Sequence, residues 1–226
     1  MGLDMYLCKM PRYRGTTPKE VSRIESYLNW LENKEEGGKA ADYSLEEWCG
    51  VAEDNLPSQK VIDFYKKHYD TKYWAWDTEH KYGHKMIMQE AAYWRKANAI
   101  HQWFVDNVQN GIDDCGYHRE VTEDDLENLL DICKTVLKSS VLIDGKLENG
   151  KHVEDGEWVT DYTDGMVIED SSVAEELLPT QSGFFFGGTA YDEWYVKDIE
   201  NTIQIIEKVL KETDFDIYAI YYCSSW

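Results

Sequence analysis

The sequence lacks the cysteine pattern of a disulfide framework or of a structural zinc site. Its cysteines are odd in number and include no CxxC pair; they are Cys8, Cys49, Cys115, Cys133 and Cys223. A framework or a zinc site uses paired, closely spaced cysteines. We therefore expect reduced thiols in a cytoplasmic protein, with no bound metal and no cofactor.

Long apolar segments are also missing. No apolar run approaches the roughly 20 residues that a membrane-spanning helix needs. The N-terminus has neither the basic nor the apolar part of a signal peptide. These absences predict a protein without a membrane partner that stays in the cytoplasm in which it is made.

Positive charge is scarce. The chain holds 23 Lys and Arg against 44 Asp and Glu, a formal charge of −21, which disfavours direct binding to DNA, RNA or anionic lipid. One interpretation is a well-solvated surface. Another is an acidic surface that imitates a nucleic acid and occupies the basic groove of a host protein.

Recognised catalytic motifs are absent too. The sequence contains no GxGxxG, GxxxxGK[ST], GxSxG or HExxH, and no serine or cysteine in a known nucleophile setting. A standard hydrolase, kinase or dehydrogenase is thereby disfavoured. We assign no catalytic residue from these motifs.

What is present indicates one α+β domain over residues 1–226, with about five helices and a small sheet that includes both termini. Residues 2–10 alternate apolar and polar side chains, as a half-buried strand does, and residues 215–226 are rich in Tyr and Ile. Capping boxes or apolar periodicity predict helices that start at Pro18, after Ser44, after Pro57, after Thr122 and near Tyr191.

Residues 144–176 form an acidic segment with eleven acids against Lys146 and Lys151. Asp-Gly and Asn-Gly pairs divide it into turn-sized pieces, which suggests two hairpins, over 141–160 and 158–169. We expect an exposed insertion or flap, rich in β-structure or loops, that faces a partner.

The stretch from Met86 to Cys115 carries the longest helical pattern. Its apolar residues share one face at helical spacing, and Asn110-Gly111 suits a left-handed end. Glu90 and His101 fall inside that apolar arc, with Asn98 at its edge. Buried polar groups need partners, so these side chains either fasten neighbouring elements together or face a cavity.

The candidate ligand-binding residues follow from this helix. Glu90, Trp94, Asn98 and His101 are spaced 4, 4 and 3 apart and would form one wall, with Arg95 and Lys96 at its rim. In a ligand site they would bind a nucleotide-like small molecule. The alternatives are a buried hydrogen-bonded staple to the terminal strands, or an enzyme of unrecognised class with Glu90 and His101 as its acid–base pair.

Residues 60–103 add a basic, aromatic region with eight Lys or Arg against five acids. Rings beside cationic groups suit a nucleotide whose base stacks while its phosphates pair with Arg95 or Lys96. The alternative is that the rings fill a core and the lysines are solvated.

Metal and phosphate signals are weak. His80 and His84 are four residues apart, and Cys115 and His118 have a ligand-like spacing, but no second pair completes a zinc site. A magnesium ion held by Asp113 and Asp114 is a further alternative. Gly187-Gly188-Thr189 is expected at a helix start, where backbone N–H groups can bind a phosphate. The acids that follow would repel an anion, so a helix cap without a bound phosphate is the favoured interpretation.

Four segments together resemble an uncharacterised family of bacterial, prophage and phage proteins. They are GLDMYL, YWRKANAIHQWFVDNVQNGIDDC, LLPTQSGFFFGGTAYDEWY and the closing SSW. The resemblance covers about half the chain and implies an accessory protein of mobile elements. We therefore expect a binding function, either sequestration of a nucleotide-like molecule or inhibition of a host defence component, with a host protein as the alternative partner.

Overall fold

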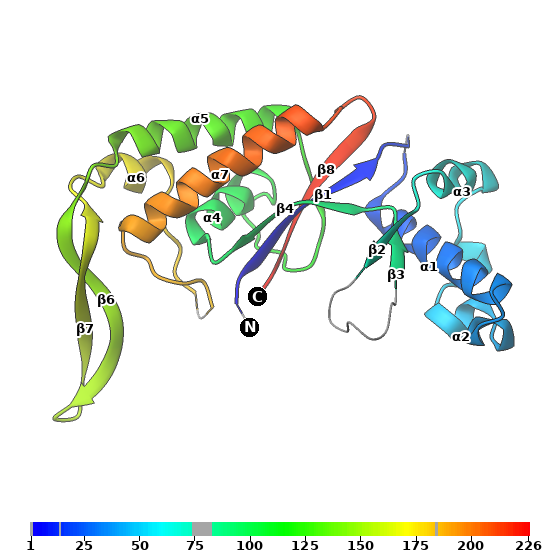
Figure 1. Cartoon of the computed structure of the whole chain (residues 1–226), viewed down its shortest axis with the longest axis horizontal. Coiled ribbons are helices and arrows are strands. Elements are labelled where there is room, and N and C mark those ends of the chain that lie inside the picture. The colour runs from blue at the N-terminus through cyan, green and yellow to red at the C-terminus, as the bar shows by residue number, and fades with distance from the viewer. Residues whose placement is uncertain (1, 14, 74–82, 184) are drawn as a thin grey trace. The chain divides into compact units, whose positions relative to one another are not determined.

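The computed structural model describes residues 2–13, 15–73, 83–183 and 185–226 (Figure 1). The predicted α+β class is confirmed. Within the described residues there are seven α-helices, five of them with eight residues or more, and a sheet that includes the first and the last strand. Both terminal strands lie close to their predicted positions.

The chain divides into two compact units. The first comprises Met1–Cys8, Glu90–Phe215 and Ile220–Trp226, and the second comprises Lys9–Gln89 and Asp216–Ala219. The expectation that residues 1–226 fold as a single domain stays a prediction.

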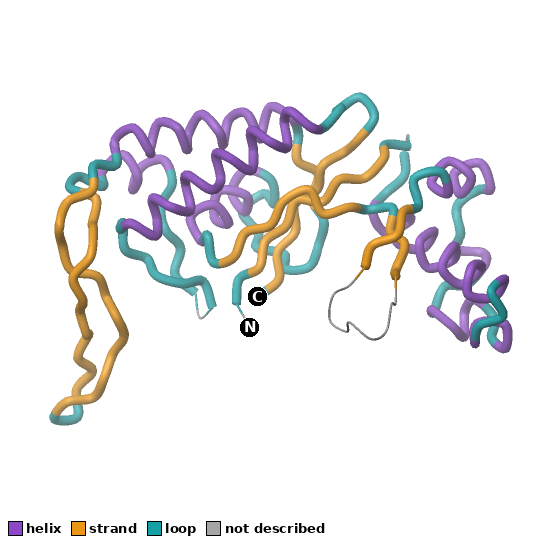
Figure 2. Tube along the Cα trace, in the orientation of Figure 1, coloured by secondary structure: helices purple, strands orange, loops and turns teal. Residues whose placement is uncertain are grey.

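A four-stranded sheet organises the first unit. Its order is β4-β1-β8-β5, and its strands are β4 (Gln89–Arg95), β1 (Asp4–Pro11), β8 (Tyr218–Ser225) and β5 (Arg119–Val121). Helices α4 (Asn98–Asn107), α5 (Glu123–Ser139) and α7 (Glu193–Glu212) lie on one side of these strands (Figure 2). The helix α6 (Ser172–Leu177) lies beside α5.

The core of this unit forms between the sheet and the helices. Met5 and Leu7 of β1 and Leu3 just before it point into this core and have no exposed surface. Tyr222 of β8 stacks on Phe104 of α4 with ring centroids 4.0 Å apart. One face of the sheet is therefore covered, and Asp4, Tyr6 and Cys8 project from the other.

The second unit is mainly helical. It contains α1 (Pro18–Glu35), α2 (Leu45–Cys49), α3 (Gln59–Lys66) and the strands β2 (Asp70–Tyr73) and β3 (Gly83–Met86). The predicted capping boxes are confirmed: Thr17 and Glu20 cap α1, and Ser44 and Glu47 cap α2.

The long helix predicted from Met86 to about Asn110 is wrong in its first half. Residues 89–95 form β4, the helix begins only at Asn98, and it ends at Asn107. Lys96 separates the two elements with a φ of 61°, and its N–H donates to the Leu3 carbonyl at 2.8 Å. Pairing with the sheet has overridden the local helical pattern.

The acidic segment forms one long hairpin in place of the two that were predicted. Strands β6 (Leu142–Glu154) and β7 (Glu157–Ile168) pair along their length and turn at Asp155-Gly156. Both turn residues have positive φ, 51° and 86°, as a two-residue hairpin turn of type I′ requires.

The other glycines of the hairpin have different roles. Gly150 lies where the register shifts between Glu148 and Lys151, which is a bulge. Gly145 and Gly165 are directly paired, and a methyl group on Gly145 would lie 2.5 Å from Val167 Cγ2. These two glycines therefore permit close side-chain packing inside the hairpin and mark no turn.

The segment before α7 also differs from prediction. The sequence FFF at 184–186 is typical of a short buried strand, but Phe185 and Phe186 lie in a turn, while Phe184 is outside the described residues. The helix starts at Glu193, after the N-cap Asp192, so Gly187-Gly188-Thr189 belongs to a loop and is not a helix start.

Candidate functional site

A pocket of about 420 Å³ lies where the turn between β4 and α4 faces the start of α7. We call it the β4–α4 pocket. All its lining residues belong to the first unit. Its charged lining residues are Arg95, Lys96, Glu148, Asp192 and Asp198, and Asn98, Gly187, Gly188 and Trp194 also line it. Three predicted ligand-binding residues, Arg95, Lys96 and Asn98, are thus at its wall.

One wall of the pocket is cationic. Arg95 and Lys96 are exposed, and both extend beside Gly2, where a methyl group would lie 3.6 Å from Arg95 Nη2 and 3.4 Å from Lys96 Cε. The first turn of α4 lines the same pocket, and its N-cap Ala97 makes no side-chain capping hydrogen bond. The positive end of the helix dipole adds to the two side-chain charges.

The opposite wall comes from α7 and carries an unusual acid. Burial, together with the neighbouring Asp192 carboxylate, raises the pKa of Asp198 to about 6. Trp194, also at this wall, has 63% of its surface exposed. A half-buried carboxyl with a shifted pKa and an exposed indole are both typical of binding sites.

The shifted pKa of Asp198 predicts a pH-dependent stability. The carboxyl binds its proton more tightly in the folded chain, so ionisation costs stability as pH rises from about 4 through 6. We expect Asp198→Asn to raise the free energy of unfolding by about 1 to 2 kcal/mol at pH 8, after allowance for partial exposure, and by less at pH 5. Urea titrations at both pH values measure the difference.

Glu200→Gln, an exposed change on the same helix, is the matched control. It should alter stability by less than about 0.5 kcal/mol at either pH. An Asp198→Asn variant that is equally stable with the wild type at pH 8 would contradict the predicted cost of ionisation.

Asn98 links the start of α4 to the loop before α7. Its amide nitrogen donates to the carbonyls of Phe186 and Gly188 at 3.1 and 2.8 Å, and its amide oxygen accepts from the Gln181 N–H at 3.0 Å. The amide group of Asn98 is thus hydrogen-bonded to the loop before α7. We infer that this side chain positions the pocket wall, while other lining residues contact a ligand.

His101 and Trp94 lie in the core and are not among the pocket-lining residues described. His101 is 1% exposed, with Nδ1 2.7 Å from Tyr222 Oη and Nε2 3.1 Å from Asp113 Oδ2. Trp94 Nε1 donates to Thr202 Oγ1 at 3.0 Å. His101 therefore has the arrangement of the staple alternative, a hydrogen bond to the C-terminal strand, whereas Trp94 is bonded to α7.

The predicted burial of Glu90 is wrong. Because residues 89–95 form a strand, Glu90 is exposed at the start of β4 and does not share a helical face with His101. Burial and the charges of Asp4 and Glu90 raise the pKa of Tyr6, which lies on the sheet face away from the helices. The Glu90–His101 acid–base pair of the enzyme alternative is therefore not formed.

The other sequence signals have mixed outcomes. His80, Trp74, Trp76 and Tyr82 lie outside the described residues, which leaves much of the basic, aromatic region without a structural account. Among the acids considered for magnesium, Asp113 accepts from His101 and Trp226, and Asp114 accepts from Gln109 and Arg119. Their oxygens are thus engaged by protein donors.

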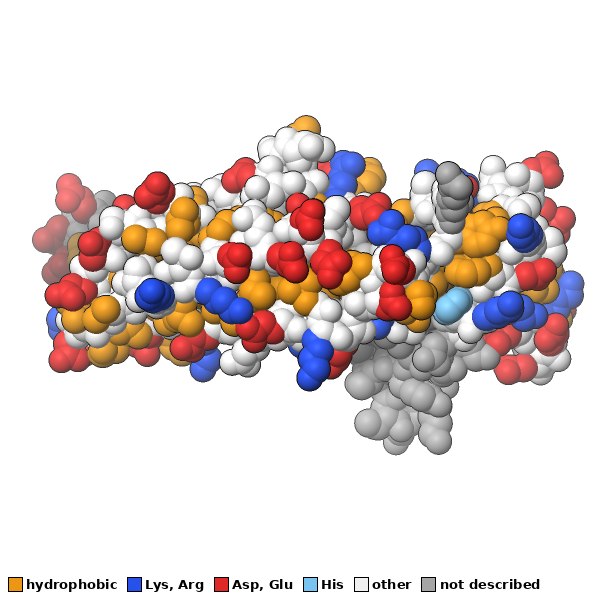
Figure 3. All heavy atoms as spheres, turned by 90° about the horizontal axis from the view of Figure 1, so that it is seen from above, with side chains coloured by type: hydrophobic (Ala, Val, Ile, Leu, Met, Phe, Trp, Pro, Cys, Tyr) orange, Lys and Arg blue, Asp and Glu red, His pale blue; other side chains and the backbone are white. Residues whose placement is uncertain are grey.

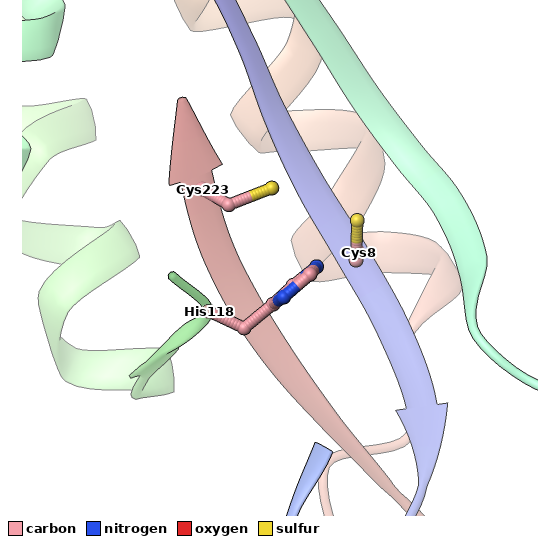
Figure 4. Close-up of side chains that lie close together, drawn as sticks. All are labelled: Cys8, His118 and Cys223. Carbon is pink, nitrogen blue, oxygen red and sulfur yellow. The ribbon is translucent and has the colours of Figure 1, made fainter. Parts of the chain in front are cut away.

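Sequence reasoning missed a cluster of Cys8, His118 and Cys223. The two sulfurs and an imidazole nitrogen lie within 4.8 Å of one another, and the side chains point toward one another over the sheet (Figure 4). Hydrogen bonds from Cys8 and His118 hold the pKa of the Cys223 thiol below its usual range, against the effect of burial. Only the spacing of Cys115 and His118 hinted at His118, and Cys115 is not in the cluster.

No protein-family profile, curated protein or solved structure matches this chain. Among the described residues, no helix has both the length and the apolar character needed to cross a membrane.

Proposed function

We propose that the protein binds a nucleotide-like anionic small molecule in the β4–α4 pocket and sequesters it. In the setting that the family resemblance implies, this takes place in the cytoplasm of a host cell and counteracts host defence. The observation that carries the proposal is the common wall formed by Arg95, Lys96 and the uncapped first turn of α4.

The chemistry of each wall supports this ligand class. Arginine, lysine and helix N–H groups together favour phosphate. The exposed indole of Trp194 offers a stacking surface for a base. The carboxyl of Asp198 can accept a hydrogen bond from a sugar hydroxyl or an exocyclic amine. Gly187 and Gly188 add no side chain, so a ligand can approach the backbone there.

Calorimetry and thermal-shift measurements with linear and cyclic nucleotides at millimolar concentration test the proposal. At least one nucleotide should raise the melting temperature. The double change Arg95→Gln with Lys96→Gln should then weaken its binding by about 10-fold or more, since a hydrogen bond to a charged group contributes about 1.5 to 3 kcal/mol.

Lys197→Gln is the matched control, because Lys197 is exposed on α7 and is not among the pocket-lining residues. It removes one positive charge and should leave affinity unchanged. The proposal is contradicted if no nucleotide changes the melting temperature. It is also contradicted if Lys197→Gln loses as much affinity as the double variant.

A second candidate function is the acidic decoy, in which the flap at 144–176 and the acidic helix start at 120–131 bind a nucleic-acid-binding host protein. The observation in its favour is Trp158 near the hairpin turn, which is 74% exposed. Against it, Lys146 of the hairpin pairs with Asp164. The face shown in Figure 3, on the side of α5 and α7, has basic side chains among its acidic ones. Decoy binding should weaken steeply with salt and disappear when Glu154, Asp155 and Glu157 are neutralised.

A further inference from the structure

The register of the sheet brings three soft ligands together from distant parts of the chain. Strand β5 pairs with β8 through Arg119↔Tyr222, and one further step of this antiparallel register places His118 opposite Cys223. Strand β1, which carries Cys8, is the other neighbour of β8. The three residues therefore come from three adjacent positions across the sheet.

All three side chains project from the face of the sheet away from the helices. Leu7 and Tyr222 point into the core, so their neighbours Cys8 and Cys223 point the other way. Figure 4 shows the two sulfurs and the imidazole ring converging on this face. Both cysteines are half-buried and His118 is exposed, so solvent reaches the cluster from the histidine side.

We propose that Cys8, His118 and Cys223 bind a zinc ion through two sulfurs and one imidazole nitrogen, with a fourth position filled from solvent. Zinc–sulfur bonds of about 2.3 Å and zinc–nitrogen bonds of about 2.0 Å place tetrahedral ligand atoms roughly 3.3 to 3.8 Å apart. The observed spacing of up to 4.8 Å needs only a small inward movement, which an exposed histidine permits.

The donor set selects the class of metal. Thiolate and imidazole ligands favour zinc over magnesium or calcium, which prefer oxygen. Among the residues that the structure describes, no fourth Cys, His, Asp or Glu joins the cluster. Three protein ligands with one open position are the arrangement of zinc sites that bind a water or a substrate group, whereas structural zinc sites are closed by four protein ligands. This site is separate from the β4–α4 pocket and does not depend on the function proposed for it.

Cobalt(II) and zinc titrations of the reduced full-length chain test the site. Cobalt should give a thiolate charge-transfer band and tetrahedral d–d bands at one equivalent, and zinc should displace it. Cys8→Ser and Cys223→Ser should each lower the intensity of the thiolate charge-transfer band by the contribution of one sulfur. Each should also remove most of the affinity for cobalt. His118→Ala should lower the affinity for cobalt by more than about 100-fold. Loss of a residue that only hydrogen-bonds to a metal ligand already lowers metal affinity by about 10- to 100-fold, and loss of a ligand should lower it more.

Cys115→Ser is the matched control: Cys115 is an exposed free thiol three residues before His118, outside the cluster. It should bind cobalt as the wild type does. Because His118 is exposed, its variant keeps the test valid even if a cysteine variant fails to fold. The proposal is overturned if cobalt gives no thiolate band although all five thiols titrate as reduced. It is also overturned if Cys115→Ser loses as much cobalt affinity as the cluster variants, or if Cys8 and Cys223 form a disulfide that persists under reductant.

Discussion

Trp94→Ala should lower the free energy of unfolding by about 3 to 5 kcal/mol, the largest effect we expect from a single substitution in this chain. The indole is 2% exposed, meets the Phe104 ring edge-on and donates a hydrogen bond to Thr202. Truncation removes this apolar surface from the core and leaves a cavity between β4 and the helices. Urea unfolding followed by circular dichroism measures the loss.

Trp194→Ala is the control of the same residue type. Its indole is largely exposed, so stability should change by less than about 0.5 kcal/mol, while ligand binding in the β4–α4 pocket should weaken. If Trp94→Ala costs less than about 1 kcal/mol, Trp94 does not belong to a packed core and its place among the ligand-binding residues regains support.

The elements that sequence reasoning predicted well are those with local signals. The Thr17 and Ser44 capping boxes, the cap at Thr122 and the alternation in residues 2–10 are each contained within a few residues. A cap satisfies backbone N–H groups of its own helix, so no distant partner is needed to recognise it.

Strand β4 shows where such reasoning fails. Its residues Gln89 to Arg95 include Gln, Glu, Ala and Arg, all strong helix formers, and their apolar positions fit a helix continued into α4. What makes them a strand is the pairing of β4 with β1, some 85 residues earlier in the chain. Such long-range pairing leaves no trace in a local periodicity.

The same limit applies to the candidate sites. Arg95 and Lys96 were predicted at the rim of a pocket, and both line one, although they precede α4 and are not part of a helix. Cys8, His118 and Cys223 lie about a hundred residues apart, and only the order of the sheet makes them neighbours. A spacing rule that searches within one segment cannot find such a cluster.

His101→Ala should lower the free energy of unfolding by about 2 to 4 kcal/mol, because the histidine links α4 to the C-terminal strand. A neutral imidazole satisfies both contacts when Nε2–H donates to the Asp113 carboxylate and Nδ1 accepts from the Tyr222 hydroxyl. The substitution removes one hydrogen-bond partner of the buried Tyr222 hydroxyl and also leaves a cavity beside the Phe186 ring, whose centroid is 5.2 Å from that of His101.

A double-mutant cycle separates the hydrogen bond from the cavity. Tyr222→Phe keeps the ring stacked on Phe104 and removes only the hydroxyl, so it should cost about 1 to 2 kcal/mol. If His101 acts through Tyr222, the loss of unfolding free energy in the combined variant should be smaller than the sum of the two single losses, by about 1 kcal/mol.

Nucleotide affinity, corrected for the unfolded fraction, should stay unchanged in His101→Ala, since the imidazole is enclosed in the core and lies outside the pocket wall. A stable variant that loses binding would reverse the assignment and place His101 in the site.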